Sequence, residues 1–426
     1  MLNTHAIQAR RPSDLHSDFV QPLYDSYNFV NLPGTIRYLL SGIGQNHIPS
    51  PAFEGLHDRY DSVILLYVDA FGWRFFEQFA DRAPALQHIM QHGVASRITA
   101  QFPSTTAAHT TAIHTGLPPS QSGVYEWYIY EPGVDAIIAP LLFSFAGESQ
   151  REQLKQVGFA PSALFPTQTI YQDLRRLGVA SHIYQRSDIA YTSPGTVLFD
   201  GAKRIFGYAT LTEAFVNISK RLLKQNKPTY YFVYYSPIDT IGHEYGPESV
   251  EFEAEIDTFL TTLQRQLLDR AAGKQRQRVL LLITSDHGQT KVSPKTTFYI
   301  NQEIPGFRKY IALNRQGQLL VPAGSPRDLF LHIRPELLDE AHQVLSDQII
   351  GKALVVRTSE LIERGYFGPL PISAALRNRV ANLCVLPFKG ESAYWYVKGK
   401  YEQRHYGHHG GLTPDEMEIP LLACEL

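Results

Sequence analysis

The segment 101–116 places three consecutive hydroxyl-bearing residues at the start of a helix-compatible run. In the sequence QFPSTTAAHTTAIHTG, Ser104, Thr105 and Thr106 precede small residues that begin at Ala107. This pattern is typical of a helix N-terminus, where free backbone N–H groups and the positive end of the helix dipole favour an anion such as phosphate. A hydroxyl placed there can act as a nucleophile when a bound metal stabilises its alkoxide. The simpler interpretation, in which these hydroxyls only cap the helix, stays open at this point.

Carboxylates and imidazoles follow three apolar runs that are typical of buried strands. In chain order, these polar residues are Asp69, Asp239, His243, Asp286 and His287. Because ligands of open α/β sheets bind beyond the carboxyl ends of the strands, we expect these side chains at one edge of the sheet, beside the hydroxyl turn. The pair His408-His409 is a further candidate. Taken singly, each residue has a plainer interpretation as a helix cap, an ordinary turn or a solvated histidine.

Taken together, this set predicts a metal centre. Mixed Asp and His ligands suit a borderline cation such as Zn²⁺. Six protein ligands beside one hydroxyl suit two ions about 4 Å apart, an arrangement that clamps a phosphoryl group. The sequence therefore predicts two divalent metal ions, with Zn²⁺ as the ion that suits these ligands best.

Strands that alternate with helices predict an α/β fold with a doubly wound, mostly parallel sheet. The strongest strand candidates are Val63–Val68, Thr229–Tyr235 and Val279–Thr284, and the periodicity of Arg74–Met90 predicts one helix between the first two. These elements would carry the candidate ligands at their ends.

The pattern of apolar and polar residues changes over residues 305–365, where short strand-like runs and a polar helical segment predict a small inserted α+β subdomain. The main domain then comprises residues 1–304 and 366–426, with residues 1–50 as an N-terminal arm that packs a helix on it. The charged segment 273–278 predicts a solvated link rather than a nucleic-acid-binding patch.

Composition excludes several classes of protein. The chain has 426 residues, of which 44% are hydrophobic and 19% charged, so a sizeable core is expected. A formal net charge of −2 argues against a nucleic-acid polymer as partner. Two cysteines, Cys384 and Cys424, favour buried free thiols over a disulfide. Without a signal-peptide pattern or a membrane-length apolar run, we expect a cytoplasmic protein that does not bind membranes. The oligomeric state is left open.

Five motifs in the right order resemble the alkaline phosphatase superfamily and, within it, the type I phosphodiesterase/nucleotide pyrophosphatase family. They span residues 68–410, which is nearly the whole chain, and the resemblance implies an alkaline-phosphatase-like fold. The motifs are Val68-Asp69-Ala70-Phe71-Gly72, Phe102-Pro-Ser-Thr-Thr106 running on to Thr115-Gly116, Pro237-Ile-Asp239-Thr-Ile-Gly242-His243 with Gly246-Pro247, Thr284-Ser-Asp286-His287-Gly288, and Gly407-His-His409-Gly410.

The resemblance implies a role for each matching position. It implies Thr106 as the nucleophile, which also touches one of the metals, and it favours His409 over His408 because a glycine follows His409. It further implies two groups of three zinc ligands: Asp239, His243 and His409 for one ion, and Asp69, Asp286 and His287 for the other.

The chain also departs from the family pattern. His109 stands where the family has a phosphoryl-contacting asparagine, so we expect His109 to contact the phosphoryl group. Secreted members carry disulfides and extra domains that are not expected here. The segment 409–417 is also similar to the phosphoglycerate mutase branch, whereas Thr106 and the 237–247 motif favour the phosphodiesterases. Aromatic residues that could stack on a base, with core packing as the alternative, are Phe71, Trp73, Tyr125, Trp127 and Tyr128.

The function predicted from these residues is hydrolysis of a nucleotide-like phosphodiester or pyrophosphate through a phosphothreonine intermediate at Thr106. Alternatives on the same scaffold are a phosphomonoesterase, a phosphonate hydrolase or a phosphomutase. A sulfatase is disfavoured because Thr106-Ala-Ala-His-Thr110 does not match the Cys/Ser-x-Pro-x-Arg frame. An alternative of another class is a non-catalytic, metal-stabilised binding protein.

Overall fold

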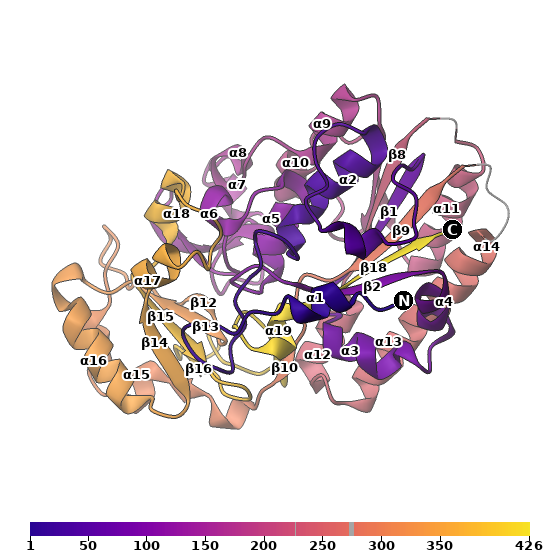
Figure 1. Ribbon diagram of the computed structural model, residues 1–426. Coiled ribbons are helices and arrows are strands. Elements are labelled where there is room, and N and C mark those ends of the chain that lie inside the picture. Colours follow the sequence, from indigo (N-terminus) through magenta and orange to yellow (C-terminus); the bar gives the residue numbers. More distant parts are fainter. Residues whose placement is uncertain (226, 272–276) are drawn as a thin grey trace.

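A seven-stranded sheet forms the centre of the computed structural model, which describes residues 1–225, 227–271 and 277–426 (Figure 1). Strand β18 runs antiparallel to both of its neighbours, and the other described pairings in this sheet are parallel. This arrangement confirms the predicted α/β class. In spatial order, the strands are β2 (Gly93–Thr99), β18 (Glu418–Glu425), β9 (Val279–Thr284), β1 (Ser62–Val68), β8 (Thr229–Tyr235), β6 (Ala180–Arg186) and β7 (Arg204–Tyr208).

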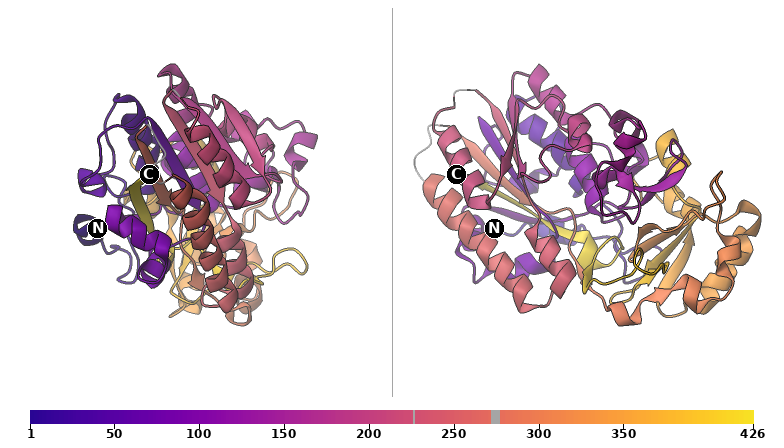
Figure 2. Two further views of the ribbon diagram at one scale, coloured as in Figure 1. Left: turned by 90° about the vertical axis from the view of Figure 1, so that its right-hand side faces the viewer. Right: turned by 180° about the vertical axis from the view of Figure 1, so that it is seen from behind.

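Helices cover both faces of this sheet, because alternate residues of its strands point to opposite sides. In β1, Val63 and Leu65 join the core on one face, whereas Ile64 and Leu66 join the core on the other. The first face is covered by α2 (Leu32–Ser41), α5 (Thr106–Thr115) and α9 (Ile170–Arg176) (Figures 1 and 2). The second face is covered by α3 (Trp73–Ala80), α4 (Pro84–His92), α11 (Leu211–Leu222) and α13 (Val250–Leu263).

The single helix predicted over 74–90 is wrong, because the chain forms α3 and α4 instead. Pro84 is the cause: its ring fixes φ and removes an N–H donor, so proline suits the first turn of a helix and not its interior. Helix α4 accordingly begins at Pro84, after a short turn at residues 81–83. In the N-terminal arm, α2 packs against α5 and α9.

A smaller antiparallel sheet lies beside the main one and is flanked by α16 (Leu338–Gln348) (Figure 1). Its strands, in spatial order, are β12 (Ala323–Ser325), β13 (Asp328–Leu331), β15 (Leu383–Pro387) and β14 (Ala353–Arg357). Strand β15 lies beyond residue 365, so this unit continues past the boundary expected for the insert. The predicted charged link at 273–278 falls largely outside the described residues.

Two further features bear on the composition. Cys384 in β15 and Cys424 in β18 are buried free thiols, as predicted. None of the helices in the described ranges combines the length and the apolar character that a bilayer crossing requires.

A buried ion pair joins the small unit to the main one. Arg327, between β12 and β13, donates from Nε and Nη2 to the two carboxylate oxygens of Glu416 at 2.9 and 2.8 Å. Glu416 lies in α19 (Pro414–Met417), directly before β18, and both side chains are fully buried. A bidentate pair of this kind fixes orientation, and loss of one partner leaves the other charge buried without compensation.

We expect Arg327→Met to lower the free energy of unfolding by about 3–5 kcal/mol, because Glu416 would remain buried without its cation. Urea denaturation at pH 7 measures this change. The matched control is Lys309→Ala, which removes an exposed pair with Glu340 and should leave the midpoint unchanged. Equal midpoints for the two variants would contradict the assignment.

Candidate metal centre

The three carboxylates predicted as metal ligands meet at the carboxyl edge of the main sheet. Asp69 directly follows β1, and one residue separates Asp286 from the end of β9. Asp239 lies in α12 (Pro237–Tyr245), which follows β8. These strands are neighbours, with β1 in the middle and its end level with the ends of β8 and β9. The sheet therefore brings together residues that are more than 200 positions apart in the sequence.

Three histidines complete this group. His243 lies one turn after Asp239 in α12, and its Nε2 is 3.3 Å from Asp239 Oδ1. His409 comes from the C-terminal loop, where β17 (Gly407–His408) pairs with β10 (Thr290–Lys291), and its Nε2 is 3.7 Å from the same oxygen. His287 Nε2 is 3.3 Å from Asp286 Oδ2 and 3.5 Å from Asp69 Oδ1.

The hydroxyl of Thr106 faces this group. Thr106 is the first residue of α5, and its Oγ1 is 3.2 Å from His287 Nε2. Neither preceding hydroxyl caps the helix: Thr105 occupies the N-cap position without a side-chain cap bond, and Ser104 Oγ donates to the Gly411 carbonyl at 2.8 Å. The capping interpretation of the hydroxyl turn is therefore wrong.

Main-chain carbonyls orient the three imidazoles. The Nδ1 atoms of His243, His287 and His409 lie 2.8, 3.0 and 3.0 Å from the carbonyl oxygens of Gly407, Gly288 and Ser104. Because a carbonyl only accepts, each Nδ1 carries the proton and each Nε2 presents a lone pair. Hydrogen bonds of this type hold metal-binding histidines in the correct tautomer.

Hydrogen-bond donors hold the three carboxylates in position. Tyr234 donates its hydroxyl to Asp69 Oδ2, and Gln289 Nε2 donates to Asp239 Oδ1 at 2.6 Å. Asp286 Oδ1 accepts from two backbone N–H groups. Asp69 Oδ1 and Asp286 Oδ2 remain buried without a hydrogen-bond partner among the described residues. Nothing in the type or spacing of Tyr234 and Gln289 marks them in the sequence as supports of the centre.

The electrostatics of the group call for a cation. Burial, and then repulsion from Asp286 and Asp239, raises the pKa of Asp69 well above its usual range. Burial and Asp286 raise the pKa of Asp239 to about 8. Burial also lowers the pKa of His243 to about 4, so this imidazole is neutral. A divalent cation would relieve the repulsion and would satisfy the two unpartnered oxygens.

The residues present fit such ions. At the sheet edge, the ligand atoms of two groups of three lie within 4.8 Å of one another: Asp239, His243 and His409, and Asp69, Asp239 and His287. Asp286 adjoins the second group through His287. All seven positions predicted as nucleophile or ligand are thus brought together.

Two cavities, of about 430 and about 380 Å³, meet at Thr106. We call them the first and the second cavity. Trp127 and Asp239 border both, and Tyr128 borders the second. Trp127 and Tyr128 are half-buried, so their rings are available to a molecule in these cavities.

The other predicted substrate contacts are not placed at the cavities. His109 is fully buried, its Nε2 accepts from the Gln101 N–H and its Nδ1 donates to the Thr105 carbonyl, both at 2.8 Å. Both ring nitrogens are thus engaged by the backbone of the turn, and burial lowers the pKa of this histidine to about 4. His109 therefore stabilises the turn and offers neither a donor nor a charge to a phosphoryl group. Phe71 is likewise fully buried and packs against Phe259 in the core.

Trp73 and Tyr125 are also core residues, with 3% and 0% of their surface exposed. For these two residues and Phe71, the alternative of core packing was the correct one.

The profile of the type I phosphodiesterase/nucleotide pyrophosphatase family matches residues 63–412. The chain belongs to this family. Its curated relatives include venom phosphodiesterase CdcPDE of Crotalus durissus collilineatus, 25% identical over 54% of this chain and 26% of that protein. Human ectonucleotide pyrophosphatase/phosphodiesterase family member 1 is 23% identical over 62% of this chain and 27% of that protein. The matched part of this chain thus spans about a quarter of the length of these relatives.

Solved structures agree with the family at the level of the fold. Murine ectonucleotide pyrophosphatase/phosphodiesterase 5 superposes with a TM-score of 0.62 at 18% identity, over 85% of this chain and 87% of that one. Phosphonoacetate hydrolase of Sinorhizobium meliloti gives a TM-score of 0.58 at 16% identity, over 84% and 89% of the two chains.

We expect the metal-free protein to lose stability as the pH rises from 6.5 to 8. Asp239, with a pKa of about 8, keeps a proton in the folded chain that the unfolded chain has lost above its ordinary pKa of 3.8. His243, with its pKa lowered from 6.5 to about 4, costs stability only below pH 6.5 and does not offset this loss. Thermal unfolding with a chelator, across this range, measures the slope.

Asp239→Asn is the control variant and should make that slope shallower, because the amide does not titrate, while Asp69, whose pKa is also raised, still contributes. A melting temperature of the metal-free protein that rises between pH 6.5 and 8 would show that the carboxylates are not protonated as described.

Proposed function

We propose that this chain hydrolyses a phosphodiester or phosphoanhydride bond of a nucleotide-like substrate, with Thr106 as the nucleophile. The observation that carries the proposal is the position of Thr106 between two cavities, beside a group of metal ligands. A phosphodiester has two arms, and each cavity offers room for one. A monoester would need only one of them.

The chemistry follows from the placement of Thr106. Its Oγ1 attacks phosphorus in line, the bond to the leaving oxygen breaks, and a phosphothreonine forms. Water then attacks the same phosphorus, and the Thr106 hydroxyl is restored. When bound, divalent ions would lower the pKa of the attacking hydroxyl and neutralise charge on the phosphoryl oxygens. The N-terminus of α5 adds its positive dipole end at the same place.

The ligand types support Zn²⁺ in both positions. Asp239, His243 and His409 would hold one ion. Asp69, Asp286 and His287 would hold the other, next to Thr106. Three protein ligands for each ion leave a coordination position for the substrate.

Nucleotide-like substrates are supported by the relatives and by the cavity walls. The relatives are named phosphodiesterases and nucleotide pyrophosphatases, and the murine structure is an inactive threonine-to-alanine variant in complex with AMP. In this chain, the half-buried ring of Trp127 borders both cavities and can stack on a base.

Two alternatives remain for comparison. The first alternative is a hydrolase of a smaller phosphoryl or phosphonyl substrate, because the fold is similar to that of a phosphonoacetate hydrolase. The second cavity favours a diester instead. A non-catalytic binding protein would keep its metals without needing a hydroxyl between two cavities.

Thr106→Ala should reduce turnover by roughly a thousandfold or more, because it removes the hydroxyl that faces the candidate metal ligands. It should keep its bound metal, since the six carboxylates and imidazoles remain. Activity assays paired with metal analysis test both points. Thr115→Ala, at the far end of α5, is the matched control and should keep normal turnover. A fully active Thr106→Ala variant would remove Thr106 from the mechanism.

The ratio of kcat/KM for a nitrophenyl nucleotide diester to that for nitrophenyl phosphate should exceed about ten, because the diester fills both cavities. Trp127→Ala should raise the KM of the diester roughly tenfold through lost stacking, with little effect on the monoester. A clear preference for the monoester would favour the phosphomonoesterase alternative.

A further inference from the structure

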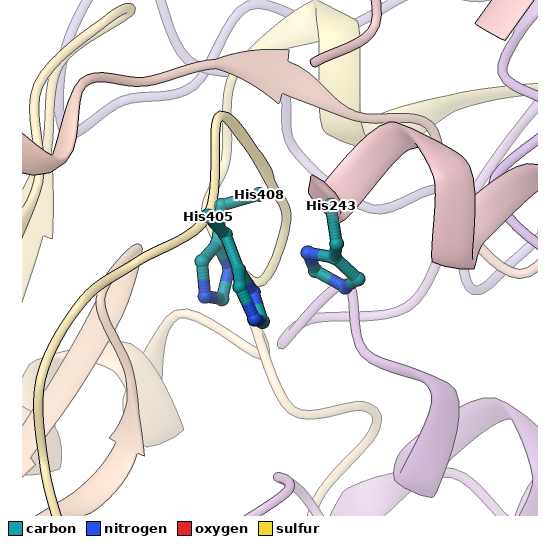
Figure 3. A group of neighbouring side chains, drawn as sticks. All are labelled: His243, His405 and His408. Atoms are coloured by element: carbon teal, nitrogen blue, oxygen red, sulfur yellow. The ribbon is translucent and has the colours of Figure 1, made fainter. Parts of the chain in front are cut away.

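A second cluster of histidines adjoins the metal centre on the side of the second cavity. His243, His405 and His408 each offer a ring nitrogen, and these three atoms lie within 4.8 Å of one another. The ring centroids are 4.5 Å apart for His243 and His405, and 5.2 Å apart for His243 and His408. Figure 3 shows His405 and His408 on the C-terminal loop, facing His243 on α12. The sequence motifs do not indicate His405 as a metal ligand, and the family resemblance favours His409 over His408 in that role.

The hydrogen bonds of these rings leave nitrogens free for a metal. His243 Nδ1 is engaged by the Gly407 carbonyl at 2.8 Å, and His408 Nδ1 by the main chain of His409 at 3.0 Å. His243 therefore presents the lone pair of Nε2. His408 Nδ1 faces both the N–H and the carbonyl of His409, and its Nε2 presents a lone pair when Nδ1 donates to that carbonyl. A set of three neutral imidazoles suits Zn²⁺, Co²⁺ or Ni²⁺ and is poorly suited to Mg²⁺ or Ca²⁺, which prefer oxygen ligands.

One member brings this cluster to solvent. His405 is exposed, whereas His408 and His409 each retain only 8% of their accessible surface. All four histidines of this region, namely His243, His405, His408 and His409, border the second cavity. His405 is therefore the most exposed of these histidines to an ion that enters through this cavity.

We propose that His243, His405 and His408 form a loading site for a borderline divalent metal ion, which then passes to Asp239 and His409. The inference builds on the metal centre of the proposed function. His243 has one free nitrogen, so it can ligate an ion in only one of the two positions at a time, and it stays bound while the other ligands change. His405 and His408 leave the ion as Asp239 and His409 join it. The inner position contains a carboxylate, so Coulomb attraction favours the transfer inward.

The loading site can be isolated from the inner position by mutation. The double variant Asp239→Asn/His409→Asn removes two ligands of the inner position and keeps all three histidines of the loading site. We expect this variant to bind one more Zn²⁺ or Co²⁺ per chain than the same variant with His405→Asn added. Equilibrium dialysis followed by metal analysis counts the ions, and no catalytic activity is needed.

His92→Asn provides a matched control in the same background. His92 is also exposed, and its ring lies 4.7 Å from that of another histidine, His88, far along the chain from the site. This substitution should leave the ion count unchanged. Equal ion counts with and without His405 would overturn the loading site. His408→Asn should lower the ion count as His405→Asn does, and this agreement would show that the loss is not a local folding defect of one variant.

Uptake kinetics test the passage of the ion. Metal-free protein carrying only His405→Asn should take Zn²⁺ from a fluorescent zinc indicator about tenfold more slowly than the unmodified chain, while reaching the same final count. Equal uptake rates would overturn the proposed transfer. If neither protein hydrolyses phosphoesters, the proposed function fails, whereas the ion counts and uptake rates still decide on the loading site.

Discussion

The structure depends on the confinement of three carboxylates to one edge of the main sheet. Asp69 and Asp286 are buried and Asp239 is half-buried, and in the described part of the chain their ion-pair partners are histidines that burial keeps neutral. Charges placed together away from water are costly unless an opposite charge compensates them. Binding of a cation at this edge would supply that opposite charge and would be thermodynamically linked to folding.

The sheet explains why this confinement could be predicted from the sequence. Each apolar run is long enough to be a strand and is buried on both faces, and parallel strands present their carboxyl ends at one edge. Val63–Val68, Thr229–Tyr235 and Val279–Thr284 therefore place the residues that follow them in one region, whatever the rest of the chain does. The order and spacing of the motifs, compared with the family pattern, supplied the remaining choices, Thr106 and His409.

Side-chain direction within turns could not be predicted in the same way. His109 lies one helical turn after Thr106, yet its ring folds back onto Gln101 and Thr105. Phe71 lies two residues after Asp69, but the positive φ of Ala70 turns the chain so that Phe71 enters the core. The C-terminal boundary predicted for the insert, residue 365, was missed for a related reason. Strand β15 lies beyond this boundary but pairs with β13 and β14, and such long-range pairing leaves no local signal in the sequence.

The balance of ligand types changes across the centre. Nearest the ends of β1 and β9, two carboxylates accompany His287; around α12, one carboxylate accompanies His243 and His409; at the solvent side, only imidazoles remain. An ion would gain Coulomb energy at each step inward, because each group contains one carboxylate more than the group outside it. Asp239 belongs to both groups of the centre, and His243 is shared between the centre and the outer histidines. Shared ligands would let an ion move inward without passing through water, because one bond would be kept while the others exchange.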